Sequence, residues 1–454
     1  MNQLMNPQSL EDRRVRIGIL SLGCPKTLVD SETILGKFVH PRYSLVPSVA
    51  DCDIALLNTC AFIEEAQKES IDRILELVQL KKEKRIRAVI VMGCLVQRFP
   101  IQLRAELKEV DAFIGSGEYA KIPEIVDRVA AGNRVFSVST PGYLATSGEA
   151  RVSLTPTHYR YLKISEGCDH VCSFCTIPSF RGKHRSRVID DVVREADRLV
   201  QEGAKEIILT GQDTTYFGKD HGGRFLLPEL IRELDKLEGL EWLRLLYAYP
   251  ACVTTELMEM MQGSKRMCHY LDMPLQHASD RMLLAMRRGI TKRRTIDLIR
   301  RFRRIVPDLA IRTTFIVGFP GETEKDFEEL LVFMEEMRFE RLGIFTYSRE
   351  EGSAAASLPG QVPEKVKKER FERTMLLQQG ISRELNRALL GKVLRVVAEE
   401  RDEENKNFWI GRSFMDAPEV DGSVFIKTKR PVTRGFFYPV TITATRDYDL
   451  VGEL

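Results

Sequence analysis

The chain has 454 residues, and its 68 basic and 65 acidic residues leave a formal net charge of only +3. Such a charge creates no global field that would attract nucleic acid or an anionic membrane, so any such argument must be local. At roughly 150 residues per domain, the length predicts about three domains. The polar segment 1–14 lacks an apolar stretch typical of a secretion signal, and no run reaches the roughly 18 apolar residues of a membrane span. We therefore expect a cytoplasmic protein with no membrane contact.

Three early segments share one design: a short apolar run that ends in a cysteine and is followed by a helical pattern. The runs cover residues 15–24, 51–60 and 87–94, and they end in Cys24, Cys60 and Cys94. Each run is typical of a buried parallel strand. In a doubly wound sheet the carboxyl ends of such strands lie at the edge where ligands bind. The pattern predicts an N-terminal doubly wound parallel α/β domain over 14–132, closed by a strand at 111–115 and a helix at 122–131, with the three cysteines converging.

A stretch rich in turn residues, with Pro141, Gly142, Ser147 and Gly148, predicts a linker over 133–153. Strand and helix patterns then alternate six times, which predicts an incomplete, TIM-like (β/α)6 barrel with its function at the carboxyl ends of the strands. The predicted strands are 159–164, 206–210, 243–248, 270–273, 311–317 and 341–346. A long helical segment at 364–390 completes this domain, which we expect to span 154–390.

Beyond Gly391 the pattern changes to short strands, and we expect a small closed β-barrel over 391–454. The predicted strands are 393–398, 408–410, 423–426 and 438–444. The overall fold class is thus α/β, with a small C-terminal β-barrel.

Nine cysteines in a long chain without a secretion signal favour metal or cluster ligation over disulfides. Cys168, Cys172 and Cys175 form a CxxxCxxC triplet directly after the first predicted barrel strand. Three thiolates this close can hold three irons of a cubane cluster and leave the fourth iron open to a small molecule. A structural zinc is the alternative, but the triplet lacks the paired CxxC spacing of common zinc ribbons and has no fourth cysteine nearby. The other cysteines, Cys52, Cys252 and Cys268, we interpret as structural.

The triplet after the first strand of a partial barrel resembles the radical S-adenosylmethionine (SAM) enzymes. That resemblance implies that SAM chelates the open iron, that an electron from the cluster cleaves SAM to a 5′-deoxyadenosyl radical, and that Phe174 lies close to the adenine. Three loops at the same barrel edge carry candidate SAM contacts, because glycine permits close backbone approach and an amide side chain can hydrogen-bond a ligand. These cofactor-binding candidates are Gly211, Gln212, Gln276 and Gly318.

The chain resembles the methylthiotransferases, whose C-terminal barrel is a TRAM domain. The resemblance rests on the cysteines at three strand ends, the barrel with the triplet and the small terminal barrel. The resemblance implies a second 4Fe–4S cluster on Cys24, Cys60 and Cys94, which carries sulfur and is methylated by one SAM, while a second SAM supplies the radical. The sequence motifs at Ser21–Lys26, Asn58–Ile63 and Ile177–Lys183 are similar to those of the RimO-type branch. Thr27 and Asp169 stand where asparagine is usual in that branch, and neither change removes a ligand.

The RimO-type resemblance implies addition of a methylthio group to the β-carbon of an aspartate in the small-subunit ribosomal protein number twelve, free or in the ribosome. It also implies an electron donor protein, and we expect a monomer. Two alternatives stay open: the same reaction on adenosine in tRNA, as in the MiaB-type branch, and a non-catalytic RNA-binding protein whose cysteines hold zinc.

Two local charge patterns bear on the partner. A basic run predicts either a solvated helix face or contact with ribosomal RNA or an acidic partner. It consists of Arg287, Arg288, Lys292, Arg293, Arg294, Arg300, Arg301, Arg303 and Arg304. An acidic patch in the C-terminal barrel suits a basic ribosomal protein better than a phosphate backbone. It consists of Glu399, Glu400, Asp402, Glu403 and Glu404.

The triplet assignment predicts the effect of removing one ligand. In Cys172→Ala, the barrel site can no longer hold three irons, so formation of 5′-deoxyadenosine from SAM under reducing conditions should be abolished. Chromatography of the reaction products checks this. Retention of deoxyadenosine formation at the wild-type rate would show that the triplet is not the site of SAM cleavage.

Overall fold

The computed structural model describes residues 14–454, so most of the polar segment 1–14 falls outside the described part of the chain. The chain divides into two compact units. The first comprises the chain up to Leu154 together with Thr176–Lys183, and the second comprises Thr155–Cys175 with His184–Leu454. Among the described helices, none combines the length and apolar character needed to cross a bilayer.

A six-stranded parallel sheet forms the centre of the first unit. In sheet order its strands are β2 (Tyr43–Leu45), β1 (Val15–Ser21), β3 (Ile54–Thr59), β4 (Ala88–Gly93), β5 (Ala112–Ile114) and β6 (Val135–Ser137). Every residue of β3 and β4 is buried, as expected for central strands that are covered on both faces. The order of the strands reverses between β1 and β3, which makes this the switch point where such sheets bind ligands.

Helices cover both faces of this sheet, because alternate strand residues point to opposite sides. Ile54, Leu56 and Ile90 pack on the side of α1 (Pro25–Gly36) and α5 (Ile122–Ala130). Ala55, Leu57, Val89 and Val91 pack on the other side. The helices there are α2 (Glu64–Lys82), α3 (Cys94–Arg98) and α4 (Pro100–Glu106), joined by α6 (Ile177–Arg181). The doubly wound N-terminal domain is therefore observed.

Besides the short edge strand β2, which the sequence did not predict, two features of the first unit differ from the sequence-based expectation. Strand β6 lies within 133–153, the predicted linker, and pairs with β5 through Phe113 and Phe136. With only three residues, β6 gives too weak a strand signal in the sequence to stand out from the turn residues that follow it. Segment 176–183 belongs to this unit although it follows the cysteine triplet in the chain, because Phe180 packs into the core of the first unit.

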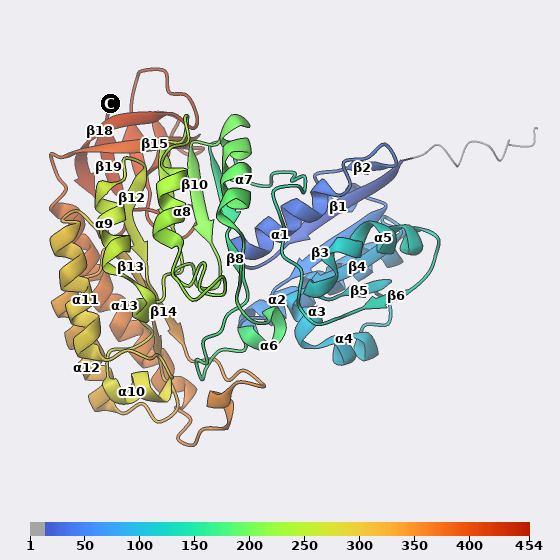
Figure 1. The fold of residues 1–454 in the computed structure, drawn as a ribbon, viewed down its shortest axis with the longest axis horizontal. Coiled ribbons are helices and arrows are strands. Elements are labelled where there is room, and N and C mark those ends of the chain that lie inside the picture. The colour runs from blue at the N-terminus through green and yellow to red at the C-terminus, as the bar shows by residue number, and fades with distance from the viewer. Residues whose placement is uncertain (1–13) are drawn as a thin grey trace, which may run out of the picture. The chain divides into compact units, whose positions relative to one another are not determined.

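The second unit begins with a parallel sheet of six strands whose spatial order follows the chain, running from green to orange in Figure 1. The strands are β7 (Tyr159–Lys163), β10 (Glu206–Thr210), β11 (Trp242–Leu245), β12 (Met267–Asp272), β13 (Ala310–Val317) and β14 (Arg341–Thr346). The helices after them are α7 (Ile189–Gln201), α8 (Leu227–Leu234), α9 (Thr255–Gly263), α10 (Asp280–Ala285), α11 (Lys292–Ile305), α12 (Glu324–Met337) and α13 (Glu364–Arg387). The predicted partial (β/α)6 barrel is confirmed.

The C-terminal strands close into a barrel, as predicted. Around the barrel they run β15 (Val393–Arg401), β16 (Phe408–Ser413), β17 (Val424–Lys427), β19 (Leu450–Glu453) and β18 (Phe437–Thr445). Strand β19 was not predicted; its four residues alternate between barrel interior and solvent and include a glycine, Gly452. Gly452 allows close packing, because a Cβ there would lie 2.4 Å from Val440 Cγ1.

Buried ion pairs join the closed barrel to the amino-terminal ends of the parallel strands. Arg412 donates to Glu206 at 2.7 Å and to Glu399 at 2.9 Å, and Arg244 donates to Glu206 at 2.6 Å. Burial opposes ionisation of Glu206, but the two guanidinium groups outweigh it and lower the pKa of Glu206. Glu399 is thus a partner of Arg412 and His158 and does not belong to the predicted acidic surface patch.

We expect Glu206→Gln to destabilise the second unit strongly. The substitution leaves Arg244 and Arg412 buried without their shared carboxylate, a change that typically costs about 3–5 kcal/mol. Urea unfolding followed by circular dichroism measures it. The matched control is Glu241→Gln, which removes the exposed pair with Arg395 and should cost at most about 1 kcal/mol. Equal effects of the two substitutions would contradict a structural role for the buried network.

Candidate functional site

The three N-terminal cysteines follow three adjacent strands. Parallel pairing aligns the carboxyl ends of β1, β3 and β4, with Ser21 opposite Asn58 and Thr59 opposite Gly93. Cys24 is the N-cap residue of α1, Cys60 follows β3 directly, and Cys94 is the first residue of α3. The loops approach closely, since a Cβ on Gly23 would lie 3.0 Å from Cys60 Sγ. The structure therefore brings together the three cysteines that the sequence analysis singled out.

Burial is the largest influence on the pKa of each of these thiols. Burial raises the pKa of Cys94 to about 12 and also raises that of Cys60. Burial acts the same way on Cys24, but Lys26, the backbone at Thr27 and Arg181 together lower its pKa below the ordinary value. A buried thiol with a raised pKa stays protonated unless a cation or metal stabilises the thiolate. A set of three sulfur donors fits an iron–sulfur cluster better than a hard cation.

Arg181 is a site residue that sequence reasoning missed. Its Nε and Nη2 donate to Cys94 Sγ at 3.1 and 3.0 Å, and its Nη1 donates to Asp30 at 2.8 Å. Both charged residues are almost fully buried. Helix α6, which ends at Arg181, carries it into the first unit. The only signal in the sequence was that Arg181 lies in Ile177–Lys183, a motif similar to the RimO-type branch. Nothing in that motif indicated a buried charge.

The CxxxCxxC triplet lies in the loop after β7 and the short strand β8 (Ser165–Glu166). All three cysteines are half-buried. Burial, with smaller contributions from Cys175 and Cys172, raises the pKa of Cys168 to about 12. Contacts of Ser173 fix the loop: its N–H donates to the Met286 carbonyl at 3.1 Å, and its hydroxyl donates to the Ala285 carbonyl at 2.7 Å. These two hydrogen bonds fix the middle of the loop that carries the three cysteines.

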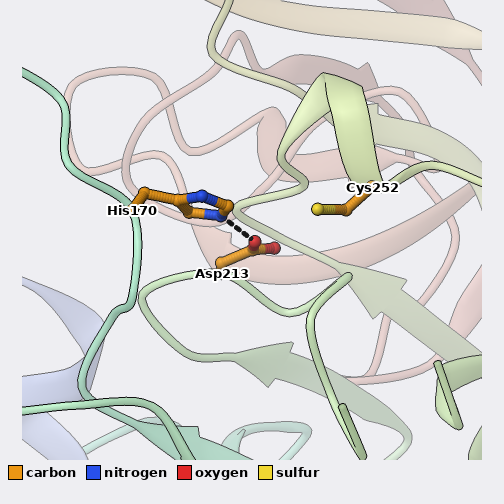
Figure 2. Close-up of side chains that lie close together, drawn as sticks. All are labelled: His170, Asp213 and Cys252. Carbon is orange, nitrogen blue, oxygen red and sulfur yellow. Dashed lines mark hydrogen bonds and ion pairs between the residues drawn. The ribbon is translucent and has the colours of Figure 1, made fainter. Parts of the chain in front are cut away.

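A histidine within the triplet anchors the same loop, as Figure 2 shows. The His170 ring nitrogen Nε2 lies 2.6 Å from Asp213 Oδ2, and the ring stacks on Tyr249 with 3.6 Å between ring centroids. Asp213 is itself fixed, since its other oxygen accepts from the N–H and the hydroxyl of Thr215. Cys252 Sγ lies near this pair, and the three potential ligand atoms are within 4.8 Å of one another. The short His170–Asp213 contact joins the cysteine loop to the end of β10, and we call this pair the His170–Asp213 latch.

Arg288 reaches the triplet from the loop between α10 and α11. Its Nη1 lies 3.4 Å from Cys172 Sγ, its Nη2 donates to the Pro274 carbonyl at 2.6 Å, and its guanidinium stacks over Tyr249. In the sequence, Arg288 belongs to a basic run predicted to lie on a solvated helix face or at a partner contact, and the solvated-face prediction is wrong for this residue. It is 5% exposed, whereas Arg293, Arg294, Arg300, Arg301 and Arg304 are exposed. The burial of Arg288 could not be predicted, because in a run of basic residues the sequence alone does not distinguish an inward-facing arginine from exposed ones.

The candidate SAM-contacting residues lie at the carboxyl ends of the barrel strands. Gln212 donates to Glu166 at 2.6 Å, while its own amide oxygen is buried without a hydrogen-bond partner and so can accept one from a ligand. Gln276 and Gly318 both have positive φ angles, 75° each, where the loops turn. Phe174 packs beside Met282, Met286 and Phe319.

Gly211 has a steric reason to be glycine, because a Cβ there would lie 2.6 Å from Ser165 Oγ. The roles of Gly211 and the other loop residues in SAM binding stay predictions.

Comparison with known proteins gives three family matches along the chain. Residues 16–115 match Uncharacterized protein family UPF0004, residues 162–334 match the Radical SAM superfamily, and residues 390–454 match the TRAM domain. Among solved structures, the radical SAM methyltransferase TsrM from Kitasatospora setae, with tryptophan and a SAM analogue bound, superposes with a TM-score of 0.53. It is 14% identical and the match covers 73% of each chain, which supports the fold alone.

Curated relatives extend over nearly the whole chain. "Ribosomal protein uS12 methylthiotransferase RimO" from Pelotomaculum thermopropionicum is 46% identical, and the match covers 97% of this chain and 99% of the relative. The protein of the same name from Geobacter sulfurreducens is 44% identical over 98% of this chain and 100% of the relative. The chain belongs to the RimO family. The RimO-type resemblance, the expected fold class and the prediction of a radical SAM methylthiotransferase that uses SAM and 4Fe–4S clusters are thereby confirmed.

The latch in this RimO-family chain leads to a specific expectation. His170→Ala should weaken retention of the barrel cluster, because the cysteine loop loses its tie to Asp213 and its stacking on Tyr249. Iron released to a chelator over time, with iron per chain measured at intervals, checks this. The control is Val171→Ala, which changes an exposed neighbour in the same loop. Identical iron loss in wild type and His170→Ala would show that the pair does not hold the loop.

Proposed function

We propose that the protein adds a methylthio group to the β-carbon of an aspartate in ribosomal protein uS12. The observation that carries the proposal is the likeness to RimO proteins over 96–98% of the chain, with both cysteine triplets inside the matched length. We assign one 4Fe–4S cluster to Cys24, Cys60 and Cys94, here called the N-terminal cluster. We assign the other to Cys168, Cys172 and Cys175, the barrel cluster.

The target atom explains why such a protein needs radical chemistry. The β-carbon of an aspartate has neither a leaving group nor a readily removed proton, so acid–base catalysis has little to act on. When bound, SAM and the clusters supply a radical that removes the hydrogen and a methylthio group that replaces it. The chain's own task is to hold and orient these groups and the substrate.

The side chains support that task in three ways. The His170–Asp213 latch and the Ser173 contacts fix the barrel-cluster loop. Gln212 presents an unpaired buried oxygen at the end of β10, suited to accept a hydrogen bond from the bound cofactor. The tight turn at Gly211 lets the backbone pass close to Ser165. Preorganised polar groups of this kind orient a ligand without a large entropic cost on binding.

The C-terminal barrel offers a surface suited to a basic protein partner. With Glu399 turned inward, Glu400, Glu403 and Glu404 remain exposed at the turn between β15 and β16. Acidic side chains repel a phosphate backbone and attract the lysines and arginines of ribosomal proteins. The substrate is therefore a protein in our proposal, free or within the small subunit. An electron donor protein, a cytoplasmic location and a monomeric state complete it.

A direct test uses the reconstituted full-length protein, SAM, a reductant and a sulfide source, with either a peptide from the target loop of uS12 or purified tRNA. We expect the peptide, read by mass spectrometry, to gain one methylthio group at its aspartate. The tRNA nucleosides should stay unmodified. Methylthiolated adenosine with an unmodified peptide would assign the protein to tRNA modification.

A Cys60→Ala variant serves as the matched control in this assay. It disables the N-terminal cluster only, so deoxyadenosine should still form while the peptide gains no methylthio group.

A further inference from the structure

Each cysteine triplet has one buried arginine directed at one of its sulfurs. Arg181 faces Cys94 in the first unit, and Arg288 faces Cys172 in the second. Both guanidinium groups belong to residues that are 5% exposed. Burying a guanidinium is costly unless a negative group compensates it, so the partner of each arginine indicates its purpose.

Arg181 contacts the sulfur of Cys94 and the carboxylate of Asp30. Two of its donors, Nε and Nη2, form a fork on the sulfur at 3.1 and 3.0 Å, and Nη1 donates to Asp30 at 2.8 Å. The fork uses the planar geometry of arginine, which lysine cannot reproduce. Asp30 is 1% exposed and shares the positive charge of Arg181 with the cysteine.

Arg288 has a different set of partners. It donates to the Pro274 carbonyl at 2.6 Å, approaches Cys172 Sγ at 3.4 Å and stacks over the Tyr249 ring. Its Nε is buried with no hydrogen-bond partner, and within residues 14–454 no carboxylate forms an ion pair with it. Within the described residues, its buried positive charge is thus not neutralised by a direct ion pair. The thiolate of Cys172, once it ligates iron, would place a negative charge within hydrogen-bond distance of the guanidinium.

We propose that Arg181 and Arg288 are positioning residues that raise the reduction potentials of the N-terminal and barrel clusters, respectively, through N–H···S contacts to Cys94 and Cys172. The proposal rests on the cluster ligands assigned above. Reduction adds one electron to a cluster that already carries the negative charge of three thiolates. A neighbouring guanidinium stabilises the reduced cluster more than the oxidised one, and hydrogen bonds to the sulfurs act in the same direction.

The experiment is a redox titration of the reconstituted full-length protein with dithionite, one electron per cluster, followed by electron paramagnetic resonance. Arg181→Met should lower the potential of the N-terminal cluster alone, and Arg288→Met that of the barrel cluster alone. At a fixed solution potential, each methionine variant should show an oxidised-to-reduced ratio of its affected cluster about tenfold higher than wild type. This corresponds to a reduction potential lowered by about 59 mV for one electron. The single-cluster variants Cys172→Ala and Cys60→Ala assign each signal to its cluster.

Two charge-matched controls remove an exposed arginine from the same units. Arg128→Met in the first unit and Arg287→Met in the second should leave both potentials unchanged. Arg181→Lys and Arg288→Lys keep the charge while losing the guanidinium geometry, so they should give intermediate shifts. They also serve as the second variant if the methionine substitutions prevent cluster assembly.

Asp30→Asn gives a prediction of opposite sign. Removing the carboxylate leaves the charge of Arg181 uncompensated, so the potential of the N-terminal cluster should rise. A fall, as expected for Arg181→Met, would show that the pair only holds the local structure and would overturn the electrostatic proposal for Arg181.

Other outcomes separate this inference from the ligand assignment. A wild-type preparation with about four irons per chain instead of about eight would contradict the assignment of two clusters. With about eight irons present, unchanged potentials in both arginine variants would overturn the inference alone. Weakened SAM binding in Arg288→Met at an unchanged potential would reassign Arg288 to the cofactor and likewise overturn it.

Discussion

The structure depends on the alignment of parallel strands. Regular hydrogen bonding between β1, β3 and β4 places the residues that follow them at one edge of the sheet, and those residues are Cys24, Cys60 and Cys94. The same constraint in the second unit places the triplet after β7 and the loops after β10, β12 and β13 at the carboxyl ends of one sheet. The candidate site residues lie together at these edges because all strands of each sheet run in the same direction.

Opposite ends of the second sheet have separate tasks. Glu206 at the amino-terminal end of β10 accepts from Arg244 of β11 and from Arg412, which joins the sheet to the closed C-terminal barrel. The carboxyl ends carry the cysteine loop, Asp213 and Arg288. This division agrees with the general behaviour of βα barrels, in which one face provides stability and the other provides the site. Charged groups are buried at both ends: Glu206 with Arg244 and Arg412 at one end, and Asp213 and Arg288 beside the cysteine loop at the other.

Much of the fold was predictable from the sequence because its signals are local. Buried parallel strands appear as short apolar runs, and a change from βα alternation to short strands marks the last barrel. Strands β6 and β19 were missed since each has only three or four residues and depends on a neighbour to form. Arg288 was misassigned because its run of basic residues gives the same sequence signal whether a side chain faces solvent or a sulfur.

The sequence by itself determined which residues are available for the chemistry: two sets of three cysteines at strand ends, and family wording that extends along the chain. The set at 168, 172 and 175 is fixed by spacing within one loop, whereas each cysteine of the other set is marked by the local strand pattern that precedes it. Only the tertiary structure decided which distant side chains surround each set. Arg181 and Asp30 meet at Cys94, and Arg288 meets Cys172, through contacts between residues 87, 151 and 116 positions apart. Burial turns those contacts into strong interactions, and burial is a property of the packed fold alone.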